Sequence, residues 1–100
     1  MRGAYKINQP YLFTEFKIVE GTYYDGGVLS HKTEDNFNDC LYKCLTNASC
    51  DYFNFGIHSK ICNLKRGGLG LKHSSANIKT GIKLEYLKSL EKNSTLIYFL

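Results

Sequence analysis

The chain of 100 residues contains no tryptophan, one proline and one methionine. It also lacks an apolar segment of about 20 residues, the length that spans a bilayer, so no membrane span is expected. The first ten residues lack the apolar stretch of a secretory signal. If the protein is secreted, its leader is therefore not present in this chain. One hundred residues are typical of a single small domain that gains from covalent staples.

Motifs for catalysis are also missing. The three histidines, His31, His58 and His73, are scattered along the chain. No nucleophile elbow, H-E-x-x-H or paired-carboxylate motif accompanies them. The glycine-rich segment 65–70 has neither a Walker A lysine-serine/threonine pair nor a GxGxxG before a helix, and it is predicted to be a mobile loop. We therefore expect a protein that is not an enzyme and that uses no cofactor.

The four cysteines have the spacing C-x3-C-x5-C-x11-C, without the C-x2-C pair of common zinc sites. An even number in a small chain indicates two disulfides, an oxidising compartment and no metal. Cys40 and Cys44 are four apart on a predicted helix, where Cβ atoms are too far apart for a bridge. Cys50 directly follows that helix and should lie near Cys44. Cys62, on the returning strand, is then favoured as the partner of Cys40.

The net charge of +4 is unevenly distributed. Residues 1–59 carry a net charge of −2, whereas residues 60–100 carry +6. This asymmetry favours an anionic partner, such as a glycan or an acidic protein surface, although a solvated face without a partner is an open alternative. No nucleic-acid-binding motif is present, so nucleic acid is not expected as a partner. The predicted ligand-binding residues are Lys65, Arg66, Lys72 and His73, with Lys60 and Lys79 near by.

Hydrophobic periodicity predicts one short helix and several strands. Apolar residues recur with helical spacing at Phe37, Cys40, Leu41, Cys44 and Leu45, and we expect Thr33 to cap this helix. Alternation predicts strands at Tyr11–Glu20, Val28–Leu29, Asp51–Ile57, Ile61–Leu64 and Gly81–Leu87, and the polar segment Leu71–Lys79 is expected to be irregular.

The aromatic side chains fall into two groups, those expected in the core and those expected on the outer surface. Phe37, Phe53 and Phe55 belong to the predicted core, together with Ile57 at the end of the same strand. The aromatic residues expected to face outward, and so to contact a ligand, are Tyr24, Tyr42 and Tyr52.

The cysteine core resembles the PAN/apple family. The resemblance rests on the helical Cys40-x3-Cys44 pair, the strand Cys50-Asp-Tyr-Phe-Asn-Phe, and Cys62-Asn-Leu. It implies an α+β fold in which a curved antiparallel sheet packs on one short helix, with disulfides Cys40–Cys62 and Cys44–Cys50. The cysteine that would make the third bridge of apple domains is missing, so the sequence is similar to the four-cysteine PAN type. The resemblance covers residues 11–88, preceded by an arm at 1–10 and followed by an extension at 89–100.

The resemblance further implies a non-catalytic, secreted or extracellular module that binds carbohydrate or protein. The alternative is a small secreted structural subunit that assembles through its terminal strands. The extension ends in an apolar run with no counterpart in the family, Leu96, Ile97, Tyr98, Phe99 and Leu100, which we expect to pair at the edge of this sheet or of another copy.

Two Asn-x-Ser/Thr sequences, at Asn47 and Asn93, are glycosylation acceptors in form. Asn93 is expected to be used more readily, since it lies in a polar connector, whereas Asn47 lies between two bridged cysteines.

Overall fold

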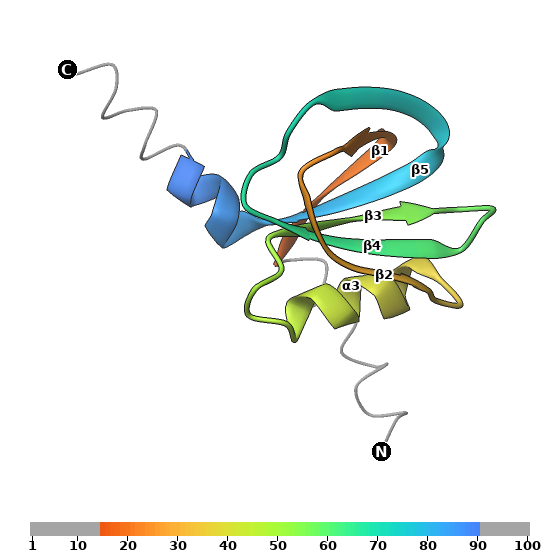
Figure 1. Ribbon diagram of the computed structural model, residues 1–100, viewed down its shortest axis with the longest axis horizontal. Helices are drawn as coiled ribbons and strands as arrows, with labels where there is room; N and C mark the ends of the chain where they lie inside the picture. Colours follow the sequence, from red (N-terminus) through yellow and green to blue (C-terminus); the bar gives the residue numbers. More distant parts are fainter. Residues whose placement is uncertain (1–14, 91–100) are drawn as a thin grey trace.

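The computed structural model describes residues 15–90, which form a curved five-stranded antiparallel sheet and two short helices (Figure 1). The expected α+β fold is confirmed. The predictions for the arm, for Asn93 and for the apolar run at 96–100 lie outside the described residues. The elements in chain order are β1 (Phe16–Tyr24), β2 (Gly27–Thr33), α3 (Phe37–Leu45), β3 (Tyr52–Gly56), β4 (Ile61–Arg66) and β5 (Lys72–Lys83), followed by a helical segment at 84–90.

The strands lie in the order β1-β5-β3-β4-β2, so β3 is central and β1 and β2 form the two edges. Phe53 of β3 is paired with Leu64 of β4 on one side and with Gly81 of β5 on the other. All five residues of β3 are buried. Both faces of the sheet are therefore covered at its centre.

Helix α3 packs on β3, β4 and β5. Its apolar stripe has the predicted spacing, and Cys40, Leu41 and Cys44 on this stripe are completely buried. The helix begins later than expected, at Phe37, because Asn36 is the N-cap and its Oδ1 accepts a hydrogen bond from Asp39 N–H at 2.9 Å. The predicted cap at Thr33 is wrong, since Thr33 pairs with Ile61 in the sheet.

The core beneath α3 is built around Phe53, which is fully buried. Its ring contacts that of Phe16 edge to face, with centroids 5.6 Å apart, and that of Phe37 at 5.1 Å. The absence of a side chain on Gly81 makes room for it, because a Cβ there would overlap the Phe53 ring. Ile57, expected in this core, lies just beyond β3 and is 41% exposed.

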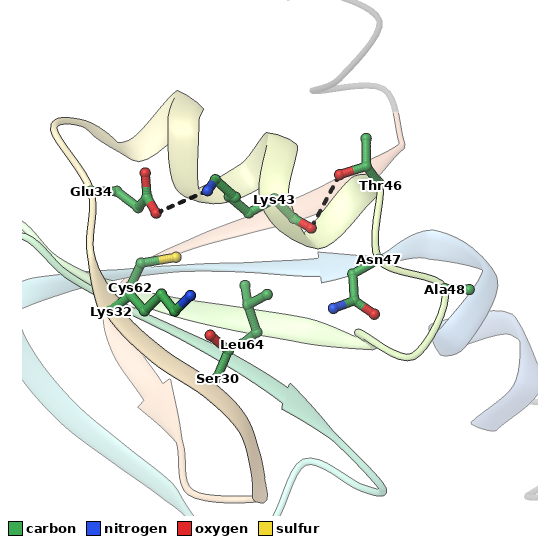
Figure 2. Close-up of a pocket in the computed structure, with 9 residues that line it drawn as sticks. All are labelled: Ser30, Lys32, Glu34, Lys43, Thr46, Asn47, Ala48, Cys62 and Leu64. Atoms are coloured by element: carbon green, nitrogen blue, oxygen red, sulfur yellow. Dashed lines mark hydrogen bonds and ion pairs between the residues drawn. The ribbon is translucent and has the colours of Figure 1, made fainter.

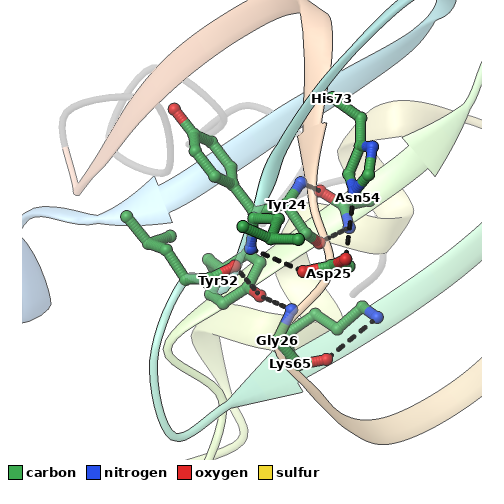
Figure 3. Close-up of polar contacts among 9 residues, drawn as sticks. Tyr24, Asp25, Gly26, Tyr52, Asn54, Lys65 and His73 are labelled. Atoms are coloured by element: carbon green, nitrogen blue, oxygen red, sulfur yellow. Dashed lines mark hydrogen bonds and ion pairs between the residues drawn. The ribbon is translucent and has the colours of Figure 1, made fainter.

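The opposite face of β3 is covered by the connection between β1 and β2, and polar side chains hold this connection in place (Figure 3). The Tyr52 hydroxyl accepts from Gly26 N–H at 2.7 Å and donates to Leu69 O at 3.0 Å. Asn54 Nδ2 donates to Tyr24 O at 2.7 Å. The expectation that Tyr52 faces outward is therefore wrong, because the chain folds back over it and leaves it fully buried.

The C-terminal part of the domain differs most from the prediction. Residues 72–74, expected to be irregular, belong to β5 and pair with β1, and the central strand β3 joins β5 only from Ile78 onward. This first part of β5 is largely exposed, which explains its polar sequence. Strand β5 ends at Lys83, and residues 84–90 are helical rather than extended. Leu84, Leu87 and Leu90 are spaced three apart, so the same segment also fits a helical period.

Candidate functional site

A groove of about 470 Å³ lies between α3 and the edge strand β2. It forms because α3 packs on β3, β4 and β5, while β2 continues the sheet beyond β4. Figure 2 shows the helix along one side of the groove, β2 along the other and β4 in the floor. The lining residues are Ser30, Lys32, Glu34, Lys43, Thr46, Asn47, Ala48, Cys62 and Leu64.

Strand β2 supplies Ser30 and Lys32 because of its register with β4. Ser30 is paired with Leu64 and Lys32 with Cys62, and both of these partners are buried beneath the helix. Side chains that are paired across neighbouring strands share a face, so Ser30 and Lys32 face the helix side. A β-bulge between Val28 and Ser30 shifts the register and so determines which residues of β2 face the helix.

Lys43 and Glu34 form an ion pair along the helix side of the groove, with Nζ and Oε2 3.6 Å apart (Figure 2). The Lys43 side chain is 57% exposed and that of Glu34 is 16% exposed. Lys32 has no ion-pair partner among the described residues. The groove therefore carries one uncompensated positive charge, at Lys32.

Asn47 forms the other end of the groove, in the turn after α3. Its Oδ1 accepts a hydrogen bond from Ser49 N–H at 2.9 Å, which requires that the Nδ2 end of the amide faces away from Ser49. In Figure 2 the Asn47 and Lys32 side chains point into the groove from opposite ends. Lys83 stabilises the turn, because its Nζ donates a hydrogen bond to Asn47 O at 3.0 Å.

The two disulfides fix the walls of the groove to one another. Cys40 of α3 is bonded to Cys62 in the floor, with Cα atoms 5.6 Å apart. Cys44 at the end of α3 is bonded to Cys50, which closes the turn that contains Asn47 and Ala48. This is the pairing expected from the sequence. The groove is thus formed before any ligand arrives, and little ordering of the protein opposes binding.

The polar side chains that line the groove are chiefly hydrogen-bond donors. Lys32 and Lys43 present ammonium donors, Ser30 a hydroxyl and Asn47 an amide N–H₂. The apolar contribution is small and comes from Leu64, Ala48 and the Cys62 sulfur. All four cysteines are in disulfides, and residues 15–90 contain no group of three histidine, cysteine or acidic side chains arranged to hold a metal ion.

The four residues predicted from the charge distribution surround the turn between β1 and β2, and two of them, Lys65 and His73, are engaged within the domain. Lys65 is only 8% exposed, and its Nζ donates to Gly26 O at 3.3 Å, in the connection between β1 and β2 that covers this face of the sheet. Lys79 lies over the Phe37 ring, 4.4 Å from its centroid. Arg66 and Lys72 are exposed, and they flank the turn at Asp25, since Arg66 pairs with Gly27 and Lys72 with Tyr24.

His73, the fourth predicted ligand residue, is already engaged within the domain. Its ring stacks on that of Tyr23, with centroids 4.8 Å apart, and its Nε2 lies 2.9 Å from Asp25 Oδ2. The hydrogen bond from His73 holds the pKa of Asp25 below its ordinary value, and the bond from Leu71 N–H acts in the same direction. The segment 65–70 was expected to be mobile, and Asp25 anchors the chain directly after it through that 2.6 Å bond to Leu71 N–H.

Sequence reasoning missed Ser30, Lys32, Glu34 and Lys43. The sequence held only a weak indication that Ser30 and Lys32 share one face of a strand. The two residues alternate with His31, but the strand was expected to end at Leu29. Polar residues at alternating positions of an edge strand are usually read as solvent-facing. The groove exists because α3 packs on β3, β4 and β5 and lies beside β2, and this arrangement depends on tertiary packing.

The fold and the cysteine framework define a small α+β module held by two disulfides, which are typical of proteins in oxidising compartments. Residues 13–92 match the PAN domain family, and because this match spans most of the chain, the protein belongs to that family. PAN domains are known as protein- or carbohydrate-binding modules and are generally non-catalytic. A search among curated proteins gave no match. No helix among the described residues is long and apolar enough to cross a membrane.

Proposed function

We propose that this PAN domain is a carbohydrate-binding module that holds an acidic saccharide in the groove between α3 and β2. The Lys32 ammonium contacts the negatively charged group of the sugar. Ser30, Asn47 and the exposed side of Lys43 donate to its hydroxyl and ring oxygens. The observation that carries this proposal is the uncompensated charge of Lys32 in a preformed groove lined largely by hydrogen-bond donors.

The dimensions of the groove favour a small ligand over a protein surface. Its volume of about 470 Å³ falls within the range of roughly 300–1,000 Å³ that is usual for small-ligand sites. A stable protein interface buries about 800 Å² on each partner and has an apolar centre. The exposed large apolar residues of the described part, Val28, Ile57 and Leu71, do not line the groove.

The charge of the groove favours an acidic sugar over a neutral one. Lys43 is already paired with Glu34, so a ligand carboxylate or sulfate adds an attraction chiefly at Lys32. A hydrogen bond that involves a charged group contributes about 1.5–3 kcal/mol, which corresponds to roughly a 10-fold to 150-fold change in affinity. The contact is near solvent, so added salt should weaken it, with a screening length of about 8–10 Å at physiological ionic strength.

The test is a calorimetric titration with a glucuronate-containing disaccharide, with the uncharged glucose analogue as the ligand control. Lys32→Ala should weaken binding of the acidic sugar at least about 10-fold. Lys17→Ala is the matched protein control, because Lys17 is an exposed lysine on β1, the opposite edge of the sheet. It should leave binding unchanged. Equal affinity for the two sugars, or equal affinity of wild type and Lys32→Ala, would contradict the proposal.

A further inference from the structure

We propose that Asn47 is an N-glycosylation acceptor and that its glycan closes the groove between α3 and β2. This inference uses the groove of the proposed function, but it concerns modification of the protein and not its ligand. A chain glycosylated at Asn47 would have Lys32 covered, and an unmodified chain would have it open.

The first argument is the conformation of the turn. Asn47, Ala48 and Ser49 form an Asn-x-Ser acceptor sequence, and Ala48 and Ser49 are exposed. From the sequence, a glycan at Asn47 was expected to have less room than one at Asn93, because Asn47 lies between two bridged cysteines. The bond from Ser49 N–H to Asn47 Oδ1 is an Asx-turn, and it leaves the Nδ2 end of the amide without a partner in the turn. The atom that would carry the sugar is the one presented outward from the turn.

The second argument is the direction in which that atom points. Nδ2 is on the groove side of the Asn47 side chain, and Lys32 enters the same groove from the other end (Figure 2). A sugar bonded to Nδ2 begins in the groove itself. Its hydroxyl groups can accept hydrogen bonds from the Lys32 ammonium and the Ser30 hydroxyl, which the described residues leave available.

The modification requires a donor of a defined class, an oligosaccharide linked to a lipid diphosphate, and a transferase of the secretory pathway. A bond forms between Asn47 Nδ2 and C1 of the first sugar, and the bond between C1 and the diphosphate oxygen breaks. The lipid diphosphate leaves with the electron pair of that bond. Nδ2 loses one proton, so the side chain remains an uncharged amide.

The experiment compares two variants of the full chain, secreted from a glycosylating eukaryotic cell behind an added leader. Both carry Asn93→Gln, which removes the other acceptor sequence. Ser49→Thr keeps the acceptor at Asn47, whereas Ser49→Ala removes it and retains the backbone N–H that forms the turn. Peptide mass spectrometry measures two quantities: the glycan occupancy of Asn47 and the extent of acetylation of Lys32 by an amine-reactive reagent, relative to Lys17.

We expect Ser49→Thr to carry a glycan at Asn47 and to show Lys32 acetylated several-fold less than in Ser49→Ala, with Lys17 equally acetylated in both. An unmodified Asn47 in Ser49→Thr would overturn the assignment of the acceptor. A glycosylated Asn47 with fully reactive Lys32 would overturn the closure of the groove. Neither readout uses a saccharide ligand, so failure of the proposed binding function would not alter them.

Discussion

Cys62 in the floor of the groove is bonded to Cys40 in the helix above it, with a Cα–Cα distance of 5.6 Å. This bond joins two segments that are 22 residues apart, and it fixes the separation of helix and sheet where the ligand is proposed to bind. The Cys44–Cys50 bond closes a shorter segment, of six residues, and restrains the turn at the end of the groove. The two bonds therefore have different roles, which leads to the first prediction.

Replacing each disulfide by a pair of alanines should separate stability from binding. On the loop-closure estimate, loss of Cys40–Cys62 costs about 3.4 kcal/mol and loss of Cys44–Cys50 about 2.4 kcal/mol of unfolding free energy. The variant without Cys44–Cys50 should also lose affinity for an acidic saccharide, because the turn that contains Asn47 becomes free to move. Denaturant unfolding and calorimetry measure the two effects. Full affinity in the Cys44→Ala/Cys50→Ala variant would show that this disulfide does not shape the site.

Tyr52→Phe should destabilise the domain by about 1–3 kcal/mol near neutral pH, because Gly26 N–H loses its acceptor in a partly buried position. Burial raises the pKa of Tyr52 to about 12. Since the folded state holds this proton more tightly than the unfolded state does, the wild type loses stability as the pH rises from about 10 to about 12. Denaturant unfolding from about pH 8 upward should show the difference between the two proteins shrinking in that window. A constant difference would contradict the role given to the hydroxyl.

The pair formed by Asp25 and His73 should be visible in an acid titration. The pKa of Asp25 is lowered chiefly by the hydrogen bond from His73, so it contributes stability that is present above about pH 4 and lost as the pH falls through the folded-state value. His73→Ala should raise the pKa of Asp25, measured from its side-chain carboxyl signal by nuclear magnetic resonance. Lys72→Ala, a change at the adjacent exposed residue, is the control and should raise it less. An unchanged pKa in His73→Ala would show that the histidine is not the dominant partner.

Gly81→Ala should destabilise the domain by about 1–3 kcal/mol, because the added Cβ overlaps the buried Phe53 ring. Phe53→Leu alone also destabilises the core, but it removes the ring that the alanine would meet. The double variant should therefore be more stable than the sum of the two single effects predicts. Denaturant unfolding of the four proteins measures this coupling, and strict additivity would contradict the packing described for Gly81.

The elements that could be predicted from the sequence are those with strong local signals. The helical spacing of Cys40, Leu41 and Cys44 defined α3, and the cysteine pattern defined the fold and the pairing of the bridges. The end of β5 was mistaken for a longer strand, because Leu84 and Tyr86 satisfy alternation and the same segment also fits a helix.

The candidate site was harder to predict because it depends on contacts between distant segments. Lys65 looks like an exposed cation in the sequence, but the turn at Gly26, 39 residues away, covers it and accepts its hydrogen bond. Lys32 looks like an ordinary edge-strand lysine, but the bulge before Ser30 and the extent of α3 place it at a groove. Net charge predicted an anionic partner, but it cannot tell which lysines stay exposed, because that depends on how the chain packs.

The most direct test of the proposed site is a chemical-shift titration of the uniformly ¹⁵N-labelled full chain with the glucuronate-containing disaccharide. If the sugar binds in the groove, the amide signals that move will be those of the lining segments, Ser30 to Glu34 and Lys43 to Ala48, with Cys62 and Leu64. The signals of Arg66, Lys72 and His73 will stay in place. Shifts confined to those three residues and their neighbours would place the anion at the turn near Asp25 and contradict the groove as the binding site.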